Sequence, residues 1–181
     1  MSGSSQTAIM TMSQKEFSKV PIIVMGVSGC GKSLVASSLA LKLNRPFIEG
    51  DSLHPRSNID KMSSGIPLDD DDRYGWLELV GDELKNNAMP IVSCSALKQK
   101  YRRHLRQRAS KPVVFLYLRI SREEAVRRMN MRVHFMPVCL IDSQFAVLEE
   151  PTNEEDIITI EGSRNPDDIE SNFISIIGAE V

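Results

Sequence analysis

A glycine-rich segment near the start of the chain has the residue types and spacing of a phosphate-binding loop. It reads Gly26-Val27-Ser28-Gly29-Cys30-Gly31-Lys32-Ser33 and matches G-x-x-x-x-G-K-[ST] at every fixed position. The glycines let the backbone turn so that successive N–H groups face an anion, and the N-terminus of a following helix adds its positive dipole end. In this pattern Lys32 reaches the β- and γ-phosphates and Ser33 binds Mg²⁺. The loop therefore predicts binding of ATP or GTP with Mg²⁺, with residues 26–33 as the nucleotide-binding set.

Other nucleotide-binding classes are disfavoured by what the sequence lacks. A GTPase would carry D-x-x-G after an apolar strand and N-K-x-D later in the chain. Asp72-Arg73-Tyr74-Gly75 matches the first pattern but follows an acidic run, and N-K-x-D is absent. At 181 residues the chain is also too short for a large ATPase motor. These observations favour a small phosphoryl-transfer enzyme that acts on a second, small substrate.

A second group of reactive side chains follows the next apolar run. Asp51 stands two residues after the end of that run, and ligands of open parallel sheets bind at the carboxyl ends of the strands. Asp51 is thus placed to accept a hydroxyl proton or to orient Mg²⁺ through water. The cations and hydrogen-bond donors that follow suit an acidic, hydroxylated acceptor; they are His54, Arg56, Lys61 and Arg73.

The composition is that of one ordinary globular domain. Lys and Arg number 22 against 24 Asp and Glu, so a general nucleic-acid surface is not expected. The three cysteines suit a reducing compartment. No apolar run is long enough to span a membrane and no secretory signal is visible, so we expect a cytoplasmic protein. We interpret residues 1–19 as a flexible tail and 20–181 as a single kinase domain.

Short apolar runs alternate with amphipathic segments along the chain. The patterns predict strands over 21–25, 46–49, 90–93, 113–118 and 157–160. They predict helices over 32–43, 76–84, 98–108, 121–131 and 165–177, the fourth opened by a capping box of Ser121 and Glu124. The stretch 50–74 shows helical spacing only around 57–62, and 134–148 is expected to be irregular. This alternation predicts an α/β fold with a parallel sheet and helices on both faces.

Three further blocks of sequence resemble the small P-loop gluconokinases. The first is G-D-x-L-H-P-x-x-N-I-x-K-M-x-x-G-x-P-L-x-D-x-D-R, which runs from Gly50 to Arg73. The second is Cys94-Ser95-Ala96-Leu97-Lys98 with Tyr101-Arg102. The third joins His134-Phe135 and Ser143-Gln144-Phe145 to Leu148-Glu149-Glu150-Pro151. With the phosphate loop, the resemblance spans about 22–177 in order and with compatible spacing.

The resemblance implies an activity, a fold and a set of roles. The activity is ATP-dependent phosphorylation of the C6 hydroxyl of D-gluconate to 6-phosphogluconate, which feeds the pentose phosphate route. The fold is like that of nucleoside monophosphate kinases: three layers, a five-stranded parallel sheet, an acceptor-binding insertion at about 50–75 and a mobile lid at about 130–150. Lys32, Asp51 and Arg132 become the catalytic residues, and Arg128 joins the nucleotide-binding set. The acceptor site becomes Asp51, His54, Arg56, Lys61, Arg73 and Lys98. Related kinases are commonly dimers, so a homodimer is an open expectation.

The sequence departs from the family pattern at two places. The family segment Arg-x-Gly-His-Phe is here Arg132-Val133-His134-Phe135, one residue shorter and without the glycine. Cys30 replaces a more usual serine, and a thiol beside a lysine at a helix N-terminus is hypothesised to have a lowered pKa and to be oxidisable.

Rival interpretations stay open at this point. One is a kinase of the same fold for another acceptor, such as shikimate or a nucleoside monophosphate. The D-x-D and G-G-G patterns typical of shikimate kinases are not matched by Glu49-Gly50-Asp51 and Ser93-Cys94-Ser95. Another is an ATP-binding protein without catalysis, suggested by the altered lid. A third is RNA binding through the basic helix 98–108, where Tyr101 is the single aromatic residue.

Several residues also have ordinary structural interpretations. A solvated turn is one of two open interpretations of the acidic run 69–72 for Asp69 and Asp70, and it is disfavoured for Asp72. Most cations of 98–108 read as a solvated helix face. Arg127 is expected to face solvent, and Cys94 and Cys139 are expected to be small buried hydrophobic residues.

Overall fold

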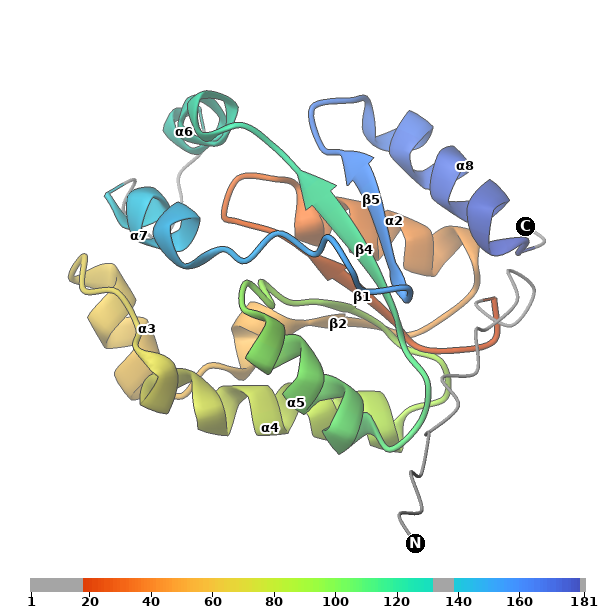
Figure 1. Cartoon of the computed structure of the whole chain (residues 1–181), viewed down its shortest axis with the longest axis horizontal. Helices are drawn as coiled ribbons and strands as arrows, with labels where there is room; N and C mark the ends of the chain where they lie inside the picture. The colour runs from red at the N-terminus through yellow and green to blue at the C-terminus, as the bar shows by residue number, and fades with distance from the viewer. Residues whose placement is uncertain (1–17, 132–138, 180–181) are drawn as a thin grey trace, which may run out of the picture.

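Five parallel strands form one sheet at the centre of the molecule (Figure 1). The computed structural model describes residues 18–131 and 139–179. The strands are β1 (Ile22–Met25), β2 (Phe47–Glu49), β3 (Ile91–Ser93), β4 (Val114–Arg119) and β5 (Ile157–Glu161), in the order β2-β3-β1-β4-β5. β1 and β3 are buried throughout. The unbroken apolar sequence of β1 follows from this burial, because a parallel strand covered on both faces has no solvent side. The predicted α/β class is confirmed.

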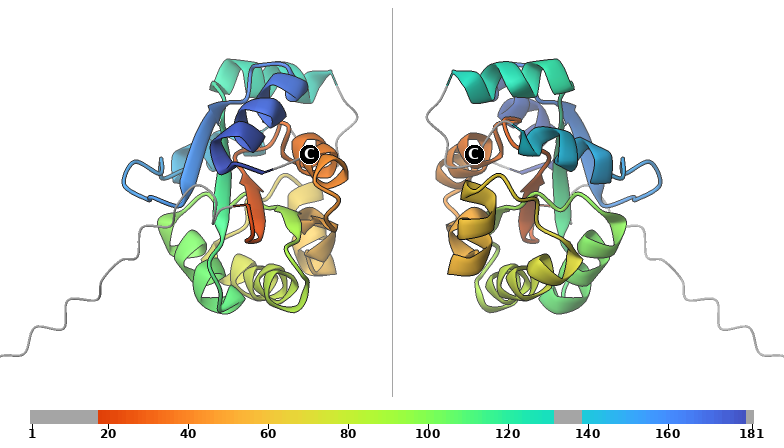
Figure 2. Two further views of the ribbon diagram at one scale, coloured as in Figure 1. Left: turned by 90° about the vertical axis from the view of Figure 1, so that its right-hand side faces the viewer. Right: turned by 90° about the vertical axis from the view of Figure 1, so that its left-hand side faces the viewer.

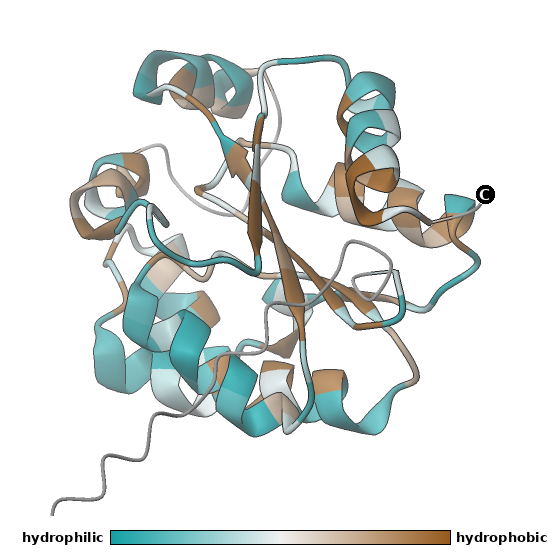
Figure 3. Cartoon of the chain, turned by 45° about the vertical axis from the view of Figure 1, so that its right-hand side comes forward, coloured by the Kyte–Doolittle hydropathy of each residue, from teal (hydrophilic) through white to brown (hydrophobic). Residues whose placement is uncertain are grey.

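Helices cover both faces of the sheet, with a separate apolar core under each pair (Figure 2). One face carries α2 (Lys32–Lys42) and α8 (Pro166–Ile177). The other carries α4 (Asp70–Asn86) and α5 (Gln99–Ala109). Alternate residues of β1 point into alternate cores, so Ile22 and Val24 join the first and Ile23 and Met25 the second. Figure 3 shows the hydrophobic strands enclosed by helices whose outer surfaces are hydrophilic.

The remaining elements follow the carboxyl ends of the strands. They are the short 3₁₀ helix η1 (Gly50–Leu53), α3 (Arg56–Ser63), α6 (Arg122–Asn130) and α7 (Leu140–Val147). The strand register keeps these ends level, since Ser93 of β3 pairs with both Val24 of β1 and Glu49 of β2. Segments that leave β1, β2 and β3 therefore meet at one edge of the sheet, which is where the predicted site residues lie in the sequence.

The predicted strands and four of the predicted helices agree with the structure to within one residue at each end. The exceptions are two regions expected to be largely irregular. α4 begins at Asp70 rather than at residue 76, because Asp69 and Asp72 form a capping box that starts the helix. The acidic run is thus a helix start, which excludes the alternative of a solvated turn at Asp69 and Asp70 and agrees with the doubt about a turn at Asp72. α7 is a regular helix inside the stretch 134–148.

In the part of the chain that the structure describes, none of the helices has the length and apolar character needed to cross a membrane. The proposed tail at 1–19 lies almost wholly outside the described residues, so the domain boundary stays a prediction.

Candidate active site

The phosphate loop connects β1 to α2 and depends on its glycines. Gly26, Gly29 and Gly31 have φ values of +144°, +83° and +98°, a region that residues with side chains rarely adopt. A Cβ on Gly29 would lie 2.9 Å from the Ala125 carbonyl oxygen of α6, so this loop could not approach that helix with a larger residue. Gly31 is also the N-cap of α2, which leaves the helix N-terminus open toward the loop.

Lys32 is buried at the start of α2. Its Nζ donates a hydrogen bond to the Val27 carbonyl oxygen at 3.1 Å. Burial by itself lowers the pKa of Lys32, but acidic groups nearby, including Asp51 and Glu49, raise the pKa overall. The ammonium group is therefore charged at neutral pH and is held against the loop.

A cavity of about 80 Å³ brings together Lys32 and Asp51, two of the three predicted catalytic residues. It is lined by Ser28, Gly29, Gly31, Lys32, Ser33, Leu34, Asp51, Arg128 and Met129. The phosphate loop, a carboxylate and two cations thus share one small space. A group of this composition can hold a phosphate chain and place a carboxylate beside it.

The backbone at Asp51 is fixed by a hydrogen-bond network at the ends of β2 and β3. The Gly50 N–H donates to Ser93 Oγ at 3.2 Å, and the Gly50 carbonyl accepts from Trp76 Nε1 at 2.7 Å. Ser93 Oγ donates in turn to the Glu49 carboxylate. A Cβ on Gly50 would lie 2.0 Å from the Ser93 carbonyl oxygen, so only glycine fits between the strands. The network sets the position of the neighbouring Asp51.

A larger cavity of about 360 Å³ shares Gly29, Gly31, Leu34 and Arg128 with the smaller one. Its other lining residues are Cys30, Val35, Arg127, Met131, Gly162, Arg164, Pro166 and Ile169. Arg128 reaches the shared boundary while its Nε contacts Glu124 at 2.7 Å. Hydrogen bonds from Arg127 and Arg128 lower the pKa of Glu124 to about 2, so the acid is ionised and orients both guanidinium groups. Arg127 is exposed, as predicted, although it also lines this cavity.

His54 is held next to Trp76 at the beginning of the acceptor segment. The two rings stack with centroids 4.2 Å apart and planes 14° apart. Burial, together with the positive charge of Arg73, lowers the pKa of His54 to about 4. His54 is consequently neutral at physiological pH. It can exchange hydrogen bonds with a hydroxyl group, but it does not supply the cation that the sequence suggested.

Asn58 connects His54 to the start of α4. Its side-chain nitrogen donates to the Asp72 carbonyl oxygen at 2.8 Å and lies 3.3 Å from His54 Nδ1. Asn58 is 2% exposed, and its buried amide is satisfied by these hydrogen-bond partners.

Three of the predicted acceptor cations are held by partners around the same helix start. Lys61 Nζ lies 2.6 Å from Asp72, and Lys98 Nζ lies 2.9 Å from Asp70. Arg73 donates to the Leu68 carbonyl oxygen and lies over the Tyr101 ring, 5.9 Å from its centroid. These contacts join α3, α4 and the start of α5 into one polar cluster.

Arg56, one of the predicted acceptor residues, is not joined to this cluster. The side chain of Arg56 is 85% exposed and pairs with Asp60 of its own helix at 2.9 Å. Arg132 lies outside the described residues, as do His134 and Phe135 of the altered lid segment.

The structure corrects three interpretations of individual residues. Cys30 is 1% exposed, and burial raises the pKa of its thiol despite the nearby Lys32, so the proposed low-pKa thiolate is wrong. Cys94 is buried as predicted, but Cys139 is exposed. Arg102, expected on a solvated face, is 1% exposed and lies 2.6 Å from Glu154.

Sequence reasoning missed several residues of the site. Asn58 and Gln144 stood inside the motifs that carried the family resemblance, but no chemistry pointed to them separately. Trp76, the one tryptophan of the chain, was assigned only to a helix. Asp70 binds Lys98, Lys100 and Tyr101, a convergence that sequence spacing alone does not reveal.

Comparisons with known proteins show which families this chain resembles. The family model described as shikimate kinase matches residues 28–161. The thermosensitive gluconokinase of Escherichia coli is 49% identical over 77% of this chain and 77% of its own length. The gluconokinase of Gluconobacter oxydans is 42% identical over 88% of this chain and 92% of its own length.

Solved structures with a similar fold were also found. A gluconokinase from Sinorhizobium meliloti superposes with a TM-score of 0.82 and 42% identity, covering 88% of this chain and 92% of its own. A shikimate kinase from Aquifex aeolicus superposes with a TM-score of 0.62 at 19% identity, which shows a shared fold.

Proposed function

Because the chain belongs to the gluconokinase family, within the wider group matched by the shikimate kinase model, we propose that it transfers a phosphoryl group from ATP to the C6 hydroxyl of D-gluconate. The observation that carries the proposal is the cavity shared by Lys32, Ser33 and Asp51. It lies at the carboxyl edge of the sheet, where an α/β protein binds its ligands.

The two cavities suit the two ends of ATP. The smaller one offers backbone N–H groups, the N-terminus of α2 and the Lys32 ammonium, all of which bind phosphate oxygens. The larger one adds the apolar side chains of Leu34, Val35 and Ile169, which suit the nucleoside. Arg128 borders both and would contact the phosphates, as the sequence predicted.

Mg²⁺ fits this site as a partner of the phosphates. In the described residues, no group of three or more His, Cys, Asp or Glu side chains could hold a metal. Mg²⁺ in kinases needs only one or two protein ligands, because substrate phosphates and waters complete its shell. Ser33 would supply a hydroxyl and Asp51 a carboxylate, directly or through water. When bound, the ion would neutralise phosphate charge during transfer.

The acceptor cluster suits a polyhydroxy acid. Neutral His54 and Asn58 offer hydrogen bonds to hydroxyl groups, and Arg73 offers a cation for the carboxylate. Lys61 and Lys98 are further acceptor-binding residues in this proposal, each already oriented by an aspartate. The role of Arg56 requires its exposed side chain to turn toward the acceptor, and the role of Arg132 rests on the family resemblance alone.

Asp51 is the proposed base. Phosphoryl transfer proceeds through a loose transition state, so alignment of the hydroxyl and stabilisation of charge matter more than early proton removal. Asp51 would hold the C6 hydroxyl in line with the γ-phosphate and accept its proton as the bond to phosphorus forms. Lys32 and the loop would stabilise charge on the transferred group and on the departing ADP.

The pathway, localisation and oligomeric state are also part of the proposal. The product, 6-phosphogluconate, would enter the pentose phosphate route in the cytoplasm. The protein would form a homodimer, as related kinases commonly do. Neither a shikimate kinase activity nor a protein that only binds ATP is favoured by the relatives.

An acceptor panel tests the function. ADP release would be followed by a coupled assay with gluconate, gluconate epimers, shikimate and nucleoside monophosphates, each with ATP and Mg²⁺. We expect gluconate to give a kcat/KM at least about a hundredfold above any other acceptor, because a site built to bond several hydroxyls rejects analogues that leave its polar groups unpaired. Preferred turnover of shikimate or a nucleotide would contradict the proposal, and ATP binding without any acceptor-dependent turnover would indicate a protein without catalysis.

A further inference from the structure

One side chain that the mechanism above does not use holds the phosphate loop at two points. Gln144 lies on α7 and is 8% exposed. Its Oε1 accepts the Ser28 N–H at 2.7 Å, and its Nε2 donates to Ser28 Oγ at 3.0 Å. Gln144 belongs to the Ser143-Gln144-Phe145 motif, which contributes to the family resemblance but has no role in the proposed mechanism. The contact joins α7 to the nucleotide site across 116 positions of sequence.

The peptide group held by Gln144 is the one that holds the catalytic lysine. The Ser28 N–H and the Val27 carbonyl belong to the same planar peptide unit. The Val27 carbonyl accepts hydrogen bonds from Lys32 Nζ at 3.1 Å and from the Cys30 N–H at 3.3 Å. Gln144 and Lys32 therefore form hydrogen bonds with the N–H and the carbonyl, respectively, of one planar peptide group. If that plane rotates, the carbonyl that receives the lysine turns with it.

The surrounding loop cannot fix this plane by its own preferences. Gly26 and Gly29 lie on either side of the Val27–Ser28 pair, and both have positive φ values. Glycine has the widest choice of backbone angles, so a loop built on it loses more conformational entropy on ordering than other loops do. Two hydrogen bonds from a buried side chain on a packed helix supply the missing constraint.

We propose that Gln144 is a positioning residue for Lys32, acting through the Val27–Ser28 peptide. The proposal rests on the proposed role of Lys32 in binding the phosphates of ATP. Gln144 keeps the loop in the shape that places the ammonium group at the phosphate cavity. It does not contact the reacting atoms in this scheme.

ATP affinity without any acceptor is the property to measure. Gln144→Met keeps the length and apolar volume of the side chain but removes both hydrogen bonds. Two typical hydrogen bonds correspond to about a thirtyfold effect, so we expect the Kd for ATP to rise roughly tenfold to thirtyfold. The KM for gluconate should change by less than about twofold, since Gln144 does not border the acceptor cluster.

A double-mutant cycle separates positioning from a general structural role. ATP affinity would be measured for the wild type, Gln144→Met, Lys32→Met and the double variant. If Gln144 acts through Lys32, the second substitution adds less than about a twofold loss once Lys32 is gone. Losses that multiply, or wild-type ATP affinity in Gln144→Met, would overturn the proposal.

Controls within α7 keep the result specific. Ser143→Ala alters the adjacent residue, whose hydroxyl donates to the Leu140 carbonyl of the same helix at 2.7 Å, and should leave ATP affinity unchanged. If Gln144→Met does not fold, as judged by circular dichroism, Gln144→Asn replaces it in the cycle, because the shorter amide cannot make both bonds. A wild-type chain that binds no ATP would overturn the proposed function itself, which differs from a wild type and variant that bind ATP equally.

Discussion

Asp51 and Lys32 line the same small cavity, but their charges serve different ends of the reaction. Lys32 is a buried cation on the phosphate loop and would bind the nucleotide in both ground and transition states. Asp51 is half-buried in η1, which follows β2, and in the proposed function it contacts the acceptor hydroxyl. The two residues should thus affect binding and turnover differently.

Replacing Asp51 by asparagine tests this division. The amide keeps the size of the side chain but can neither accept the hydroxyl proton nor carry a negative charge. We expect kcat to fall by about a hundredfold or more, the usual scale for a lost general base, while the Kd for ATP changes by less than about threefold. Steady-state kinetics would measure kcat, and an ATP titration would measure the Kd. In the comparison variant Lys32→Met, both ATP binding and turnover should weaken. An Asp51→Asn variant with full turnover would refute the role of Asp51.

At the residue scale, the sequence predicted identities better than chemical states. The phosphate-loop pattern located Lys32 and Ser33, because the spacing of that motif is itself the local structure. The neutral form of His54 depends on burial against Trp76, 22 positions later. The raised pKa of Cys30 depends likewise on packing. Burial and partners of this kind come from distant segments, which local patterns do not describe.

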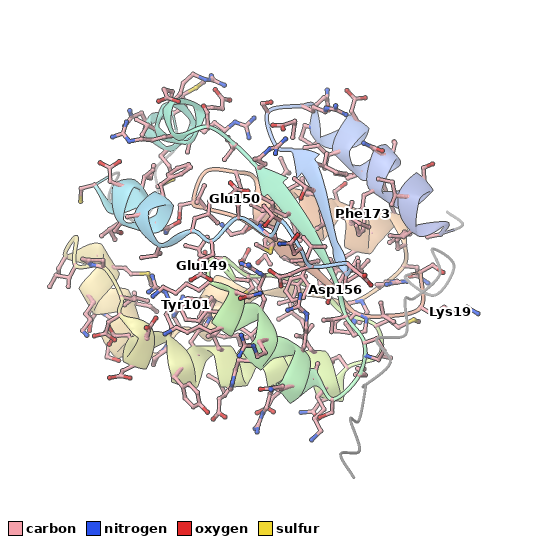
Figure 4. The ribbon with its side chains drawn as sticks, viewed as in Figure 1. Lys19, Tyr101, Glu149, Glu150, Asp156 and Phe173 are labelled. Atoms are coloured by element: carbon pink, nitrogen blue, oxygen red, sulfur yellow. The ribbon has the colours of Figure 1, made fainter. Side chains whose placement is uncertain are left out.

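At the element scale, α5 anchors the segment that returns from α7 to β5. Figure 4 shows Glu149 and Glu150 on this connection, with Asp156 just before β5 and Tyr101 on α5. Arg102 of α5 donates to the Glu149 carbonyl oxygen at 3.1 Å and pairs with Glu154 at 2.6 Å. Arg106 pairs with Glu154 and Asp156, at 2.7 Å each. Arg102 and Arg106 therefore stabilise the fold through these ion pairs, which argues against the RNA-binding interpretation of this helix.

Removal of Arg102 should therefore destabilise the fold. Although burial raises the pKa of Glu154, hydrogen bonds from Arg102 and Arg106 lower it overall, so the acid is charged and depends on both partners. Arg102→Met should lower the free energy of unfolding by about 3 kcal/mol, because it removes one member of a buried ion pair. Urea denaturation would measure the change.

Arg103→Met is the matched control, since Arg103 is the exposed neighbour on the same helix. It should change the free energy of unfolding by no more than about 0.5 kcal/mol. Equal midpoints for the two variants would show that the buried network does not stabilise the fold.

The helices and strands themselves were largely predictable. Regular elements follow from hydrophobic spacing, and that spacing was clear for the strands and for four of the predicted helices. The start of α4 was missed because its capping box consists of aspartates within an acidic run, where both a turn and a helix start are compatible with the sequence. The pattern of 134–148 predicts no regular element, so α7 (Leu140–Val147) was not predicted.

At the scale of the whole molecule, strand order explains why one edge of the sheet carries the chemistry. β1 lies at the centre between β3 and β4, so the phosphate loop emerges beside the segments that follow both neighbours. A topological switch of this kind opens a crevice at the carboxyl ends of parallel strands. The sequence predicted a parallel sheet, and the strand order then accounts for the meeting of residues 26–33 with Asp51.

Acidic and basic side chains pair with one another around the proposed site. The total of −2 disfavours a general nucleic-acid surface, but it does not indicate how the charges pair. In the described residues Lys61, Lys98 and Arg128 contact Asp72, Asp70 and Glu124 respectively. The balance therefore reflects cations that are oriented by acids around the proposed site.

The most direct test of the central claim is the identity of the product made from ATP, Mg²⁺ and D-gluconate. Phosphorus and proton NMR of the reaction mixture would show which oxygen carries the new phosphate. We predict a single phosphomonoester whose phosphorus couples to the two protons on C6, formed in equal amount with ADP. A phosphate on any other carbon, or ADP formed with inorganic phosphate and unchanged gluconate, would contradict the account.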